Sequence, residues 1–130
     1  MSGSCDIRRG RQQVLIVDDD ASIRNLLHLY FEQEGYEVET AETGEQALER
    51  FESGRFHLVI LDYYMPGING LEVASAIHGQ DPSVPLVLIT GMAHTLANVD
   101  LTPTGIMKIF AKPFDMCELA KWLRSLADPS

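Results

Sequence analysis

The sequence lacks the features that mark membrane-spanning, disulfide-stabilised and secreted proteins. Apolar residues make up 45% of its 130 residues, but they come in short runs, well below the roughly 18 to 20 consecutive apolar residues of a transmembrane helix. The two cysteines, Cys5 and Cys117, lie far apart and do not suggest a disulfide framework. No segment of signal-peptide type opens the chain. We therefore expect a cytoplasmic protein that makes no contact with a membrane.

Positive charge is scarce beyond the first 12 residues. Ten Lys and Arg stand against 19 Asp and Glu, which gives a formal net charge of −9. Residues 1–12 hold three arginines and one aspartate, a net +2, so the other 118 residues carry −11. Such an acidic body is a poor match for DNA, and we expect no direct nucleic-acid partner. Residues 1–12 are small, polar and aperiodic, which predicts a disordered basic tail before one domain at 13–127.

Two kinds of hydrophobic segment alternate along that domain. Five short runs have the length and the apolar content of strands: 13–17, 36–42, 57–62, 84–90 and 106–111. Apolar residues at helical spacing lie between or after them, for example at Ile23, Leu27 and Phe31. Thr43, in a capping box with Gln46, and Asp115 are expected helix caps. Between the fourth and fifth strands Pro103 interrupts the pattern, so any helix there is short.

The alternation predicts an α/β fold, with an open, doubly wound parallel sheet of five strands and helices on both faces. Ligands of such sheets bind beyond the carboxyl ends of the strands. We therefore expect the polar residues that end the strands to meet at one edge. These are Asp18, Asp19 and Asp20 after the first strand, Asp62 after the third, Thr90 at the end of the fourth and Lys112 after the fifth.

This set of residue types suits phosphoryl chemistry. Carboxylates that converge from separate strands repel one another, and a bound cation relieves the repulsion. Mg²⁺ accepts one or two carboxylates and leaves room for phosphate oxygens. Lys112 and Thr90 offer a cation and a hydroxyl to the same anionic group, and a carboxylate can attack it to form an aspartyl-phosphate. Each residue alone also has a plain structural reading, Asp20 as a helix cap and Asp62 as the start of a loop.

The motifs "VDDD", "DYYMPGINGLEV", "ITG" and "KPF" occur in the order seen in the receiver domains of two-component response regulators, and residues 13–127 resemble that family. The resemblance implies a (βα)5, flavodoxin-like fold with strand order 2-1-3-4-5. It implies that Asp62 is the phosphoacceptor, Thr90 the switch hydroxyl and Lys112 the lysine that pairs with the phosphoryl group. It also implies a Mg²⁺ site made by Asp18, Asp19, Asp62 and the backbone carbonyl of Tyr64.

The resemblance carries further expectations about activity and partners. The phosphoryl group would come from a sensor histidine kinase, a phosphotransfer protein or acetyl phosphate. The chain would then be an enzyme only upon itself, and a conformational change would control a downstream protein that the sequence does not identify. A monomer or weak dimer is expected. Gly91 matches the small residue beside the phosphoryl group, and the Lys112–Pro113 peptide is expected to be cis.

Departures from the family pattern concern the switch and its lifetime. Ile109 stands where the family commonly has Tyr or Phe, whereas Phe110 should point to the opposite face and belong to the core. Ile109 and Pro103 together lead to the hypothesis that the conformational switch of this domain differs from the usual one. The hypothesis fails if phosphorylation produces the family's ordinary changes in the loop after Thr90 and in the fourth helix. Tyr64 and Met92 are bulky and are expected to slow hydrolysis of the aspartyl-phosphate.

Two other functions fit parts of the pattern. A Mg²⁺-dependent phosphohydrolase of the haloacid-dehalogenase kind also uses an aspartate at a strand end. That class needs a second acid two residues further on, where this chain has Tyr64, and a cap domain for which there is no room. A phosphorylation-independent interaction module would keep the fold without the chemistry, but the acceptor, metal, hydroxyl and lysine positions are all filled here.

Overall fold

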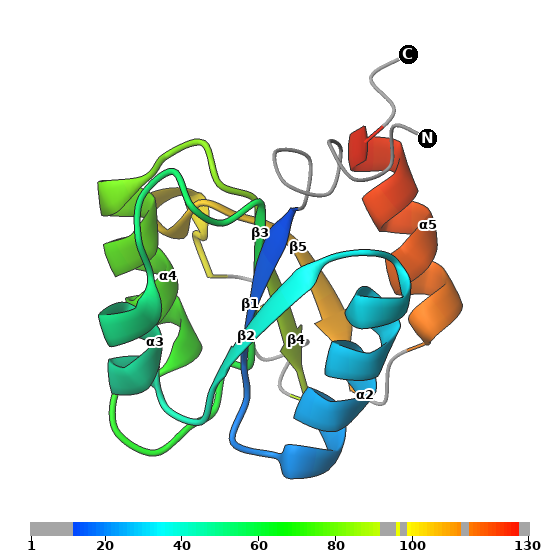
Figure 1. The fold of residues 1–130 in the computed structure, drawn as a ribbon. Coiled ribbons are helices and arrows are strands. Elements are labelled where there is room, and N and C mark those ends of the chain that lie inside the picture. Colours follow the sequence, from blue (N-terminus) through cyan, green and yellow to red (C-terminus); the bar gives the residue numbers. More distant parts are fainter. Residues whose placement is uncertain (1–11, 92–95, 97–98, 113–114, 128–130) are drawn as a thin grey trace.

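A five-stranded parallel sheet forms the centre of the protein (Figure 1). The computed structural model describes residues 12–91, 96, 99–112 and 115–127. The strand order is β2-β1-β3-β4-β5, so both the fold class and the order expected from the sequence are confirmed. The strands are β1 (Gln13–Val17), β2 (Glu37–Ala41), β3 (Leu58–Leu61), β4 (Leu86–Thr90) and β5 (Ile106–Ala111).

Helices cover both faces of the sheet (Figure 1). The helices α3 (Gly44–Arg50) and α4 (Gly70–Gln80) lie on one face, and α2 (Ala21–Gln33) and α5 (Met116–Ala127) lie on the other. None of the described helices is long and apolar enough to cross a membrane.

Polar side chains begin the helices, largely as expected. Asp20 accepts a hydrogen bond from the Ser22 N–H, and Asp115 accepts one from the Cys117 N–H. The Thr43 hydroxyl accepts from the Gln46 N–H, but the Gln46 side chain accepts from the Glu42 N–H and not from Thr43, so the reciprocal capping box expected there is incomplete. A complete box begins α4, between Asn69 and Glu72, which the sequence analysis missed.

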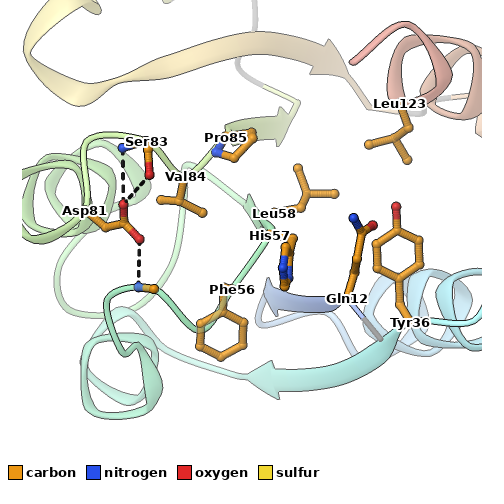
Figure 2. A pocket seen from close by; sticks show the side chains of 11 residues that line it. Gln12, Tyr36, Phe56, His57, Leu58, Asp81, Ser83, Val84, Pro85 and Leu123 are labelled. Atoms are coloured by element: carbon orange, nitrogen blue, oxygen red, sulfur yellow. Dashed lines mark hydrogen bonds between the residues drawn. The ribbon is translucent and has the colours of Figure 1, made fainter. Parts of the chain in front are cut away.

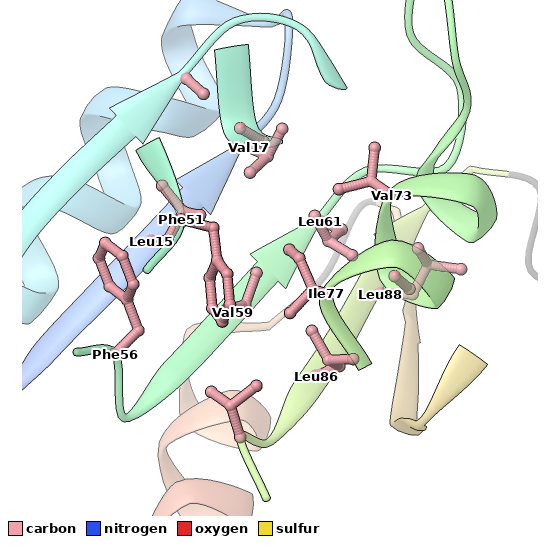
Figure 3. Close-up of a cluster of buried hydrophobic side chains, with 14 of the residues drawn as sticks. Leu15, Val17, Phe51, Phe56, Val59, Leu61, Val73, Ile77, Leu86 and Leu88 are labelled. Carbon is pink, nitrogen blue, oxygen red and sulfur yellow. The ribbon is translucent and has the colours of Figure 1, made fainter. Parts of the chain in front are cut away.

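Alternate residues of the strands supply two hydrophobic cores. The α3/α4 core, shown in Figure 3, contains Leu15, Val59 and Leu88 from the sheet and Ile77 from α4. The α2/α5 core contains the neighbouring strand residues, among them Ile16 and Ile60, together with Phe31 and Leu119 from the two helices. The central strands β1, β3 and β4 are buried on both faces, so each contains an unbroken apolar run: VLIV, LVIL and LVLI.

The connection from β4 to β5 contains no α-helix among the described residues. It holds the 3-10 turn η2 (Thr102–Thr104), with Pro103 inside it, and then Gly105 in the left-handed region at φ 72°. Leu96 is buried in the α3/α4 core. The expectation of a short helix after Thr90 stays a prediction, because residues 92–95, 97 and 98 lie outside the described part.

Phe110 lies in the core, as expected. It packs in the α2/α5 core edge-on against Trp122, with ring centroids 6.3 Å apart. Ile109, one position earlier, packs against the α3/α4 core on the opposite face. The pleat of β5 therefore places the two side chains on opposite faces of the sheet. The ring of Phe110 does not take the place of the Tyr or Phe that the family commonly has at position 109.

Burial of Phe110 predicts a large effect on stability. We expect Phe110→Ala to lower the free energy of unfolding by about 3 kcal/mol, because the ring is buried and its removal leaves a cavity beside Trp122. Met107→Ala is the matched control, since Met107 lies on the same strand but is 55% exposed, and it should change the free energy by less than about 0.5 kcal/mol. Urea denaturation measures both values. Equal effects of the two substitutions would contradict the described packing of β5.

Candidate functional site

The register of the sheet aligns the expected site residues at its carboxyl edge. Val17 of β1 pairs with Leu61 of β3, so Asp18 and Asp62 follow on neighbouring strands. The Asp62 N–H donates to the Val17 carbonyl at 2.9 Å, which extends the ladder by one residue. On the other side of the edge, the Lys112 N–H donates to the Thr90 carbonyl, also at 2.9 Å. Backbone pairing thus places the beginning of each functional loop.

Three carboxylates meet at this edge and form what we call the acidic cluster: Asp18, Asp19 and Asp62. One oxygen from each lies within 4.8 Å of the others. Asp18 and Asp62 are buried, whereas Asp19 is exposed. Three oxygens at this spacing are a suitable ligand set for a hard divalent cation, which prefers carboxylate oxygen and keeps its remaining positions for water or phosphate.

Lys112 is the cation that faces the acidic cluster. Its Nζ lies 3.0 Å from Asp18 Oδ2 and 3.3 Å from Asp62 Oδ2, so one ammonium donates to two carboxylates. Burial lowers the pKa of Lys112, but hydrogen bonding and attraction to Asp18 and Asp62 outweigh it, and the net pKa is raised. The ammonium therefore stays charged, yet it offsets only one of three negative charges.

The pKa of Asp62 is raised by its surroundings. Burial, and then the nearby charge of Asp18, raise its pKa from 3.8 to about 6. The charge and hydrogen bond of Lys112 and a hydrogen bond from the Tyr64 N–H act in the opposite direction without cancelling the rise. A carboxylate in this setting gains from any added positive charge, which is the physical reason to expect a metal ion beside it.

The surrounding backbone holds the two buried aspartates in place. The second oxygen of Asp18 accepts from the Asp20 N–H at 2.9 Å, and Arg24 Nη1 donates to the Asp18 carbonyl at 2.8 Å. At the start of α4, the Gly70 N–H donates to the Tyr63 carbonyl, and a Cβ on Gly70 would lie 2.3 Å from the Asp62 carbonyl oxygen. Only glycine allows this approach, because the atom in the way belongs to the backbone.

The sequence analysis missed the parts played by Arg24 and Gly70. Gly70 follows Asn69 in the motif "GINGLEV", and an Asn-Gly pair before a helix is a usual turn signal, but nothing in it shows which backbone the glycine approaches. Arg24 is the only lysine or arginine of α2, but its link to the Asp18 carbonyl appears only in three dimensions. Both act on the position of the acidic cluster.

The other expected site residues lie near this edge with different degrees of exposure. Thr90 is fully buried at the end of β4 and pairs with Ala111 across the ladder. Tyr64 is 75% exposed, and its backbone N–H donates to the Asp62 carboxylate. A Cβ on Gly91 would meet nothing within 4 Å, and the described atoms do not explain a need for glycine there. Met92 and Pro113 lie outside the described residues.

Comparison with known proteins agrees with this geometry. Residues 14–124 match the model of the family described as the response regulator receiver domain. The chain is 35% identical over 114 residues to the response regulator ArlR of Staphylococcus aureus, and 32% identical over 114 residues to the transcriptional regulatory protein ResD of Bacillus subtilis. Each alignment covers 88% of this chain but only 52% of ArlR and 47% of ResD. The chain therefore spans about half the length of these relatives.

Solved structures show the same fold at similar identity. The response regulator TrrA of Thermotoga maritima, crystallised with Mg²⁺-BeF, is 41% identical with a TM-score of 0.77, and the match covers 88% of this chain and 98% of TrrA. TrrA in complex with the histidine kinase ThkA matches with 39% identity and a TM-score of 0.76, over 90% of this chain and 99% of TrrA. From the family match, the relatives and the acidic edge of a 2-1-3-4-5 sheet together, we conclude that this chain belongs to the response regulator receiver domains.

Proposed function

We propose that Asp62 is the phosphoacceptor of this receiver domain. The observation that carries the proposal is the contact of its buried carboxylate with Lys112 Nζ, 3.3 Å away, inside a cluster of acidic oxygens. Burial and the nearby charge of Asp18 raise the pKa of Asp62, so its carboxylate gains from added positive charge. Its conversion to an acyl phosphate moves negative charge outward, towards Lys112, the Thr90 hydroxyl and any bound cation.

A Mg²⁺ ion fits the residues of the acidic cluster. Asp18, Asp19 and Asp62 would hold it, with the backbone carbonyl of Tyr64 as a further ligand. When bound, Mg²⁺ neutralises charge on the phosphoryl oxygens. The crystallised complex of TrrA with Mg²⁺-BeF supports this proposal.

The remaining residues would orient and stabilise the transferred group. An oxygen of Asp62 attacks phosphorus, the P–N bond of a donor phosphohistidine breaks, and the donor imidazole leaves with the electron pair of that bond and takes up a proton. The Lys112 ammonium, already hydrogen-bonded to Asp62, stabilises the charge on the phosphoryl oxygens, and Thr90 supplies a hydroxyl donor from the end of β4. The protein would act in this way only on itself.

The donor that we propose is a histidine kinase or a phosphotransfer protein. The complex of TrrA with ThkA supports a kinase partner. The chain spans about half the length of ArlR and ResD. We propose that the output of the whole protein depends on which downstream partner the phosphorylated domain contacts. We further propose that the protein is a cytoplasmic monomer or weak dimer. We also propose that its conformational switch does not use an aromatic side chain at position 109, where this chain has Ile109.

Phosphorylation by a small donor tests the proposed acceptor. We expect incubation with acetyl phosphate and Mg²⁺ to add one phosphoryl group to the parent chain, because the groups needed for the transfer belong to the receiver domain itself. Intact-mass measurement detects the adduct. The Asp62→Asn and Asp62→Ala variants should remain unmodified, and Asp100→Asn, in the exposed turn before η2, should be modified like the parent. An unmodified parent would favour the phosphorylation-independent module instead.

Removal of the Asp62 charge should stabilise the protein when Mg²⁺ is absent. Because folding raises the pKa of Asp62 from 3.8 to about 6, the folded state binds the proton more tightly, and the parent loses stability as pH rises through this window. In EDTA at pH 7.5, we expect Asp62→Asn to exceed the parent by roughly 1–3 kcal/mol in free energy of unfolding. The gain should shrink towards pH 4 and after addition of Mg²⁺, as measured by urea denaturation. A less stable variant at pH 7.5 in EDTA would contradict the described electrostatics.

The side chains of Tyr64 and Met92 should set the lifetime of the phosphorylated state. Tyr64 is exposed beside Asp62, where a ring obstructs the approach of water in line with the acyl phosphate. We expect the Tyr64→Ala, Met92→Ala double variant to lose its phosphoryl group several times faster than the parent, whereas Tyr64→Phe, which keeps the ring, should match the parent. The decay of the intact-mass adduct after removal of acetyl phosphate measures the rates. Equal or slower loss from the double variant would refute the hypothesis.

A further inference from the structure

A cavity opens at the end of the sheet opposite to the acidic cluster. It has a volume of about 380 Å³, within the size range of small-molecule pockets in proteins. Its walls come from the segments that lead into β1, β2, β3 and β4, and from α5 (Figure 2). Nothing in the proposed phosphorylation chemistry uses this end of the molecule, so we name it the amino-edge pocket and consider it separately.

One part of the amino-edge pocket is apolar and firmly placed. Its lining includes Phe56, Leu58, Val84, Pro85 and Leu123. Of these, Phe56, Leu58 and Val84 are buried and belong to the two hydrophobic cores. An apolar wall made partly by core residues is suited to a ring, because the wall does not have to rearrange to meet it.

The only carboxylate among the described lining residues is already satisfied. Asp81 accepts from the Gly54 N–H at 3.0 Å, and from the N–H and hydroxyl of Ser83 at 3.2 and 2.7 Å (Figure 2). The Gly54 hydrogen bond, followed by those of Ser83, holds the pKa of Asp81 below its ordinary value. The carboxylate therefore ties the Gly54 loop to the start of β4 and stays negative, and it does not need a cationic ligand as a partner.

The polar groups available to a ligand come from three other residues. Gln12 presents a carboxamide, Tyr36 a hydroxyl and His57 an imidazole, all on the side of the pocket away from Asp81 (Figure 2). The Nδ1 of His57 accepts a hydrogen bond from the Gln13 N–H at 3.1 Å, so the neutral ring carries its proton on Nε2 and donates from there. Together these groups can donate to and accept from one polar edge of a ligand.

The charges of the lining residues limit the class of ligand that the pocket can bind. The described lining contains no lysine or arginine, and Asp81 adds a negative charge to a domain that is acidic overall. Arg55 lies close by, with its guanidinium 4.7 Å from the centroid of the Phe56 ring, but it is paired with Glu39 and Glu52. An anionic ligand would therefore find no cation among the described lining residues and would meet the negative charge of Asp81. A cationic ligand would find the Asp81 oxygens occupied by three hydrogen bonds.

From the apolar wall, the three polar groups and the absence of lysine and arginine from the described lining, we propose that the amino-edge pocket binds a small, uncharged, planar ring compound of the nucleobase type. The ring would pack on Phe56, Leu58 and Val84, and its polar edge would exchange hydrogen bonds with Tyr36, Gln12 and His57. The site is independent of phosphorylation at Asp62, so failure of one proposal leaves the other standing.

Titration of the ¹⁵N-labelled full chain with adenine tests the proposal by NMR. We expect amide shifts confined to the pocket residues, with a dissociation constant between about 10 µM and 1 mM for a ligand of this size. Benzoate, a ring of similar size that carries a negative charge, should bind at least about tenfold more weakly. Absence of shifts with adenine at several millimolar, or shifts located at the acidic cluster alone, would overturn the proposal.

Two variants identify the contacts. Tyr36→Phe removes only the hydroxyl and should weaken adenine binding about 3- to 10-fold, the usual effect of one hydrogen bond. Leu123→Trp adds a ring at a partly exposed position of α5 and should block the pocket. Tyr30→Phe is the control, because Tyr30 packs against the same core but does not line the pocket, and it should bind like the parent. Unchanged binding by both Tyr36→Phe and Leu123→Trp would place adenine elsewhere and refute the assignment.

Discussion

The structure depends on the balance of charge between the acidic cluster and Lys112. Two buried carboxylates and an exposed one face a single ammonium, which hydrogen-bonds to Asp18 and Asp62 at once. Burial makes this imbalance costly, and the cost appears at Asp62, whose pKa rises to about 6. A site in this condition stabilises added positive charge. Chemistry that binds a cation and then a phosphoryl group relieves the imbalance, which connects the electrostatics of the domain to its role as a receiver.

The parallel sheet makes that arrangement possible because the strands themselves place the site residues. Strands β1 and β3 are adjacent, and each ends directly before an acidic residue, while β4 and β5 end at Thr90 and before Lys112. Backbone hydrogen bonds continue past the strands at Asp62 and Lys112, so both side chains start from positions that the sheet determines. The close approach of Gly70 then joins α4 to the Asp62 backbone. The backbone that follows Asp62 is therefore in direct contact with the first residue of α4.

The two ends of the sheet differ in chemistry for a topological reason. Because all five strands are parallel, the loops that follow strands lie at one edge, with the acidic cluster, and the loops that precede strands lie at the other. The second edge collects Gln12, Tyr36 and His57 beside core residues, and Asp81, the one acid in the described lining of its pocket, holds two loops together. One end is thus under-compensated in charge, whereas the other is satisfied in charge and open to a neutral ligand.

The sequence by itself determined the α/β architecture and the identity of the residues at the acidic edge. Apolar runs that stop at Asp18, Asp62 and Lys112 are local features, and the rules of parallel sheets carry them to one place. Only the tertiary structure decided that Lys112 is shared between two aspartates, that Arg24 donates to the Asp18 carbonyl, and that Gln46 turns to Glu42 and leaves the capping box of α3 incomplete. Periodicity says which face a residue is on, but distances between side chains depend on register, rotamers and neighbours from other segments, and these exist only once the chain is packed.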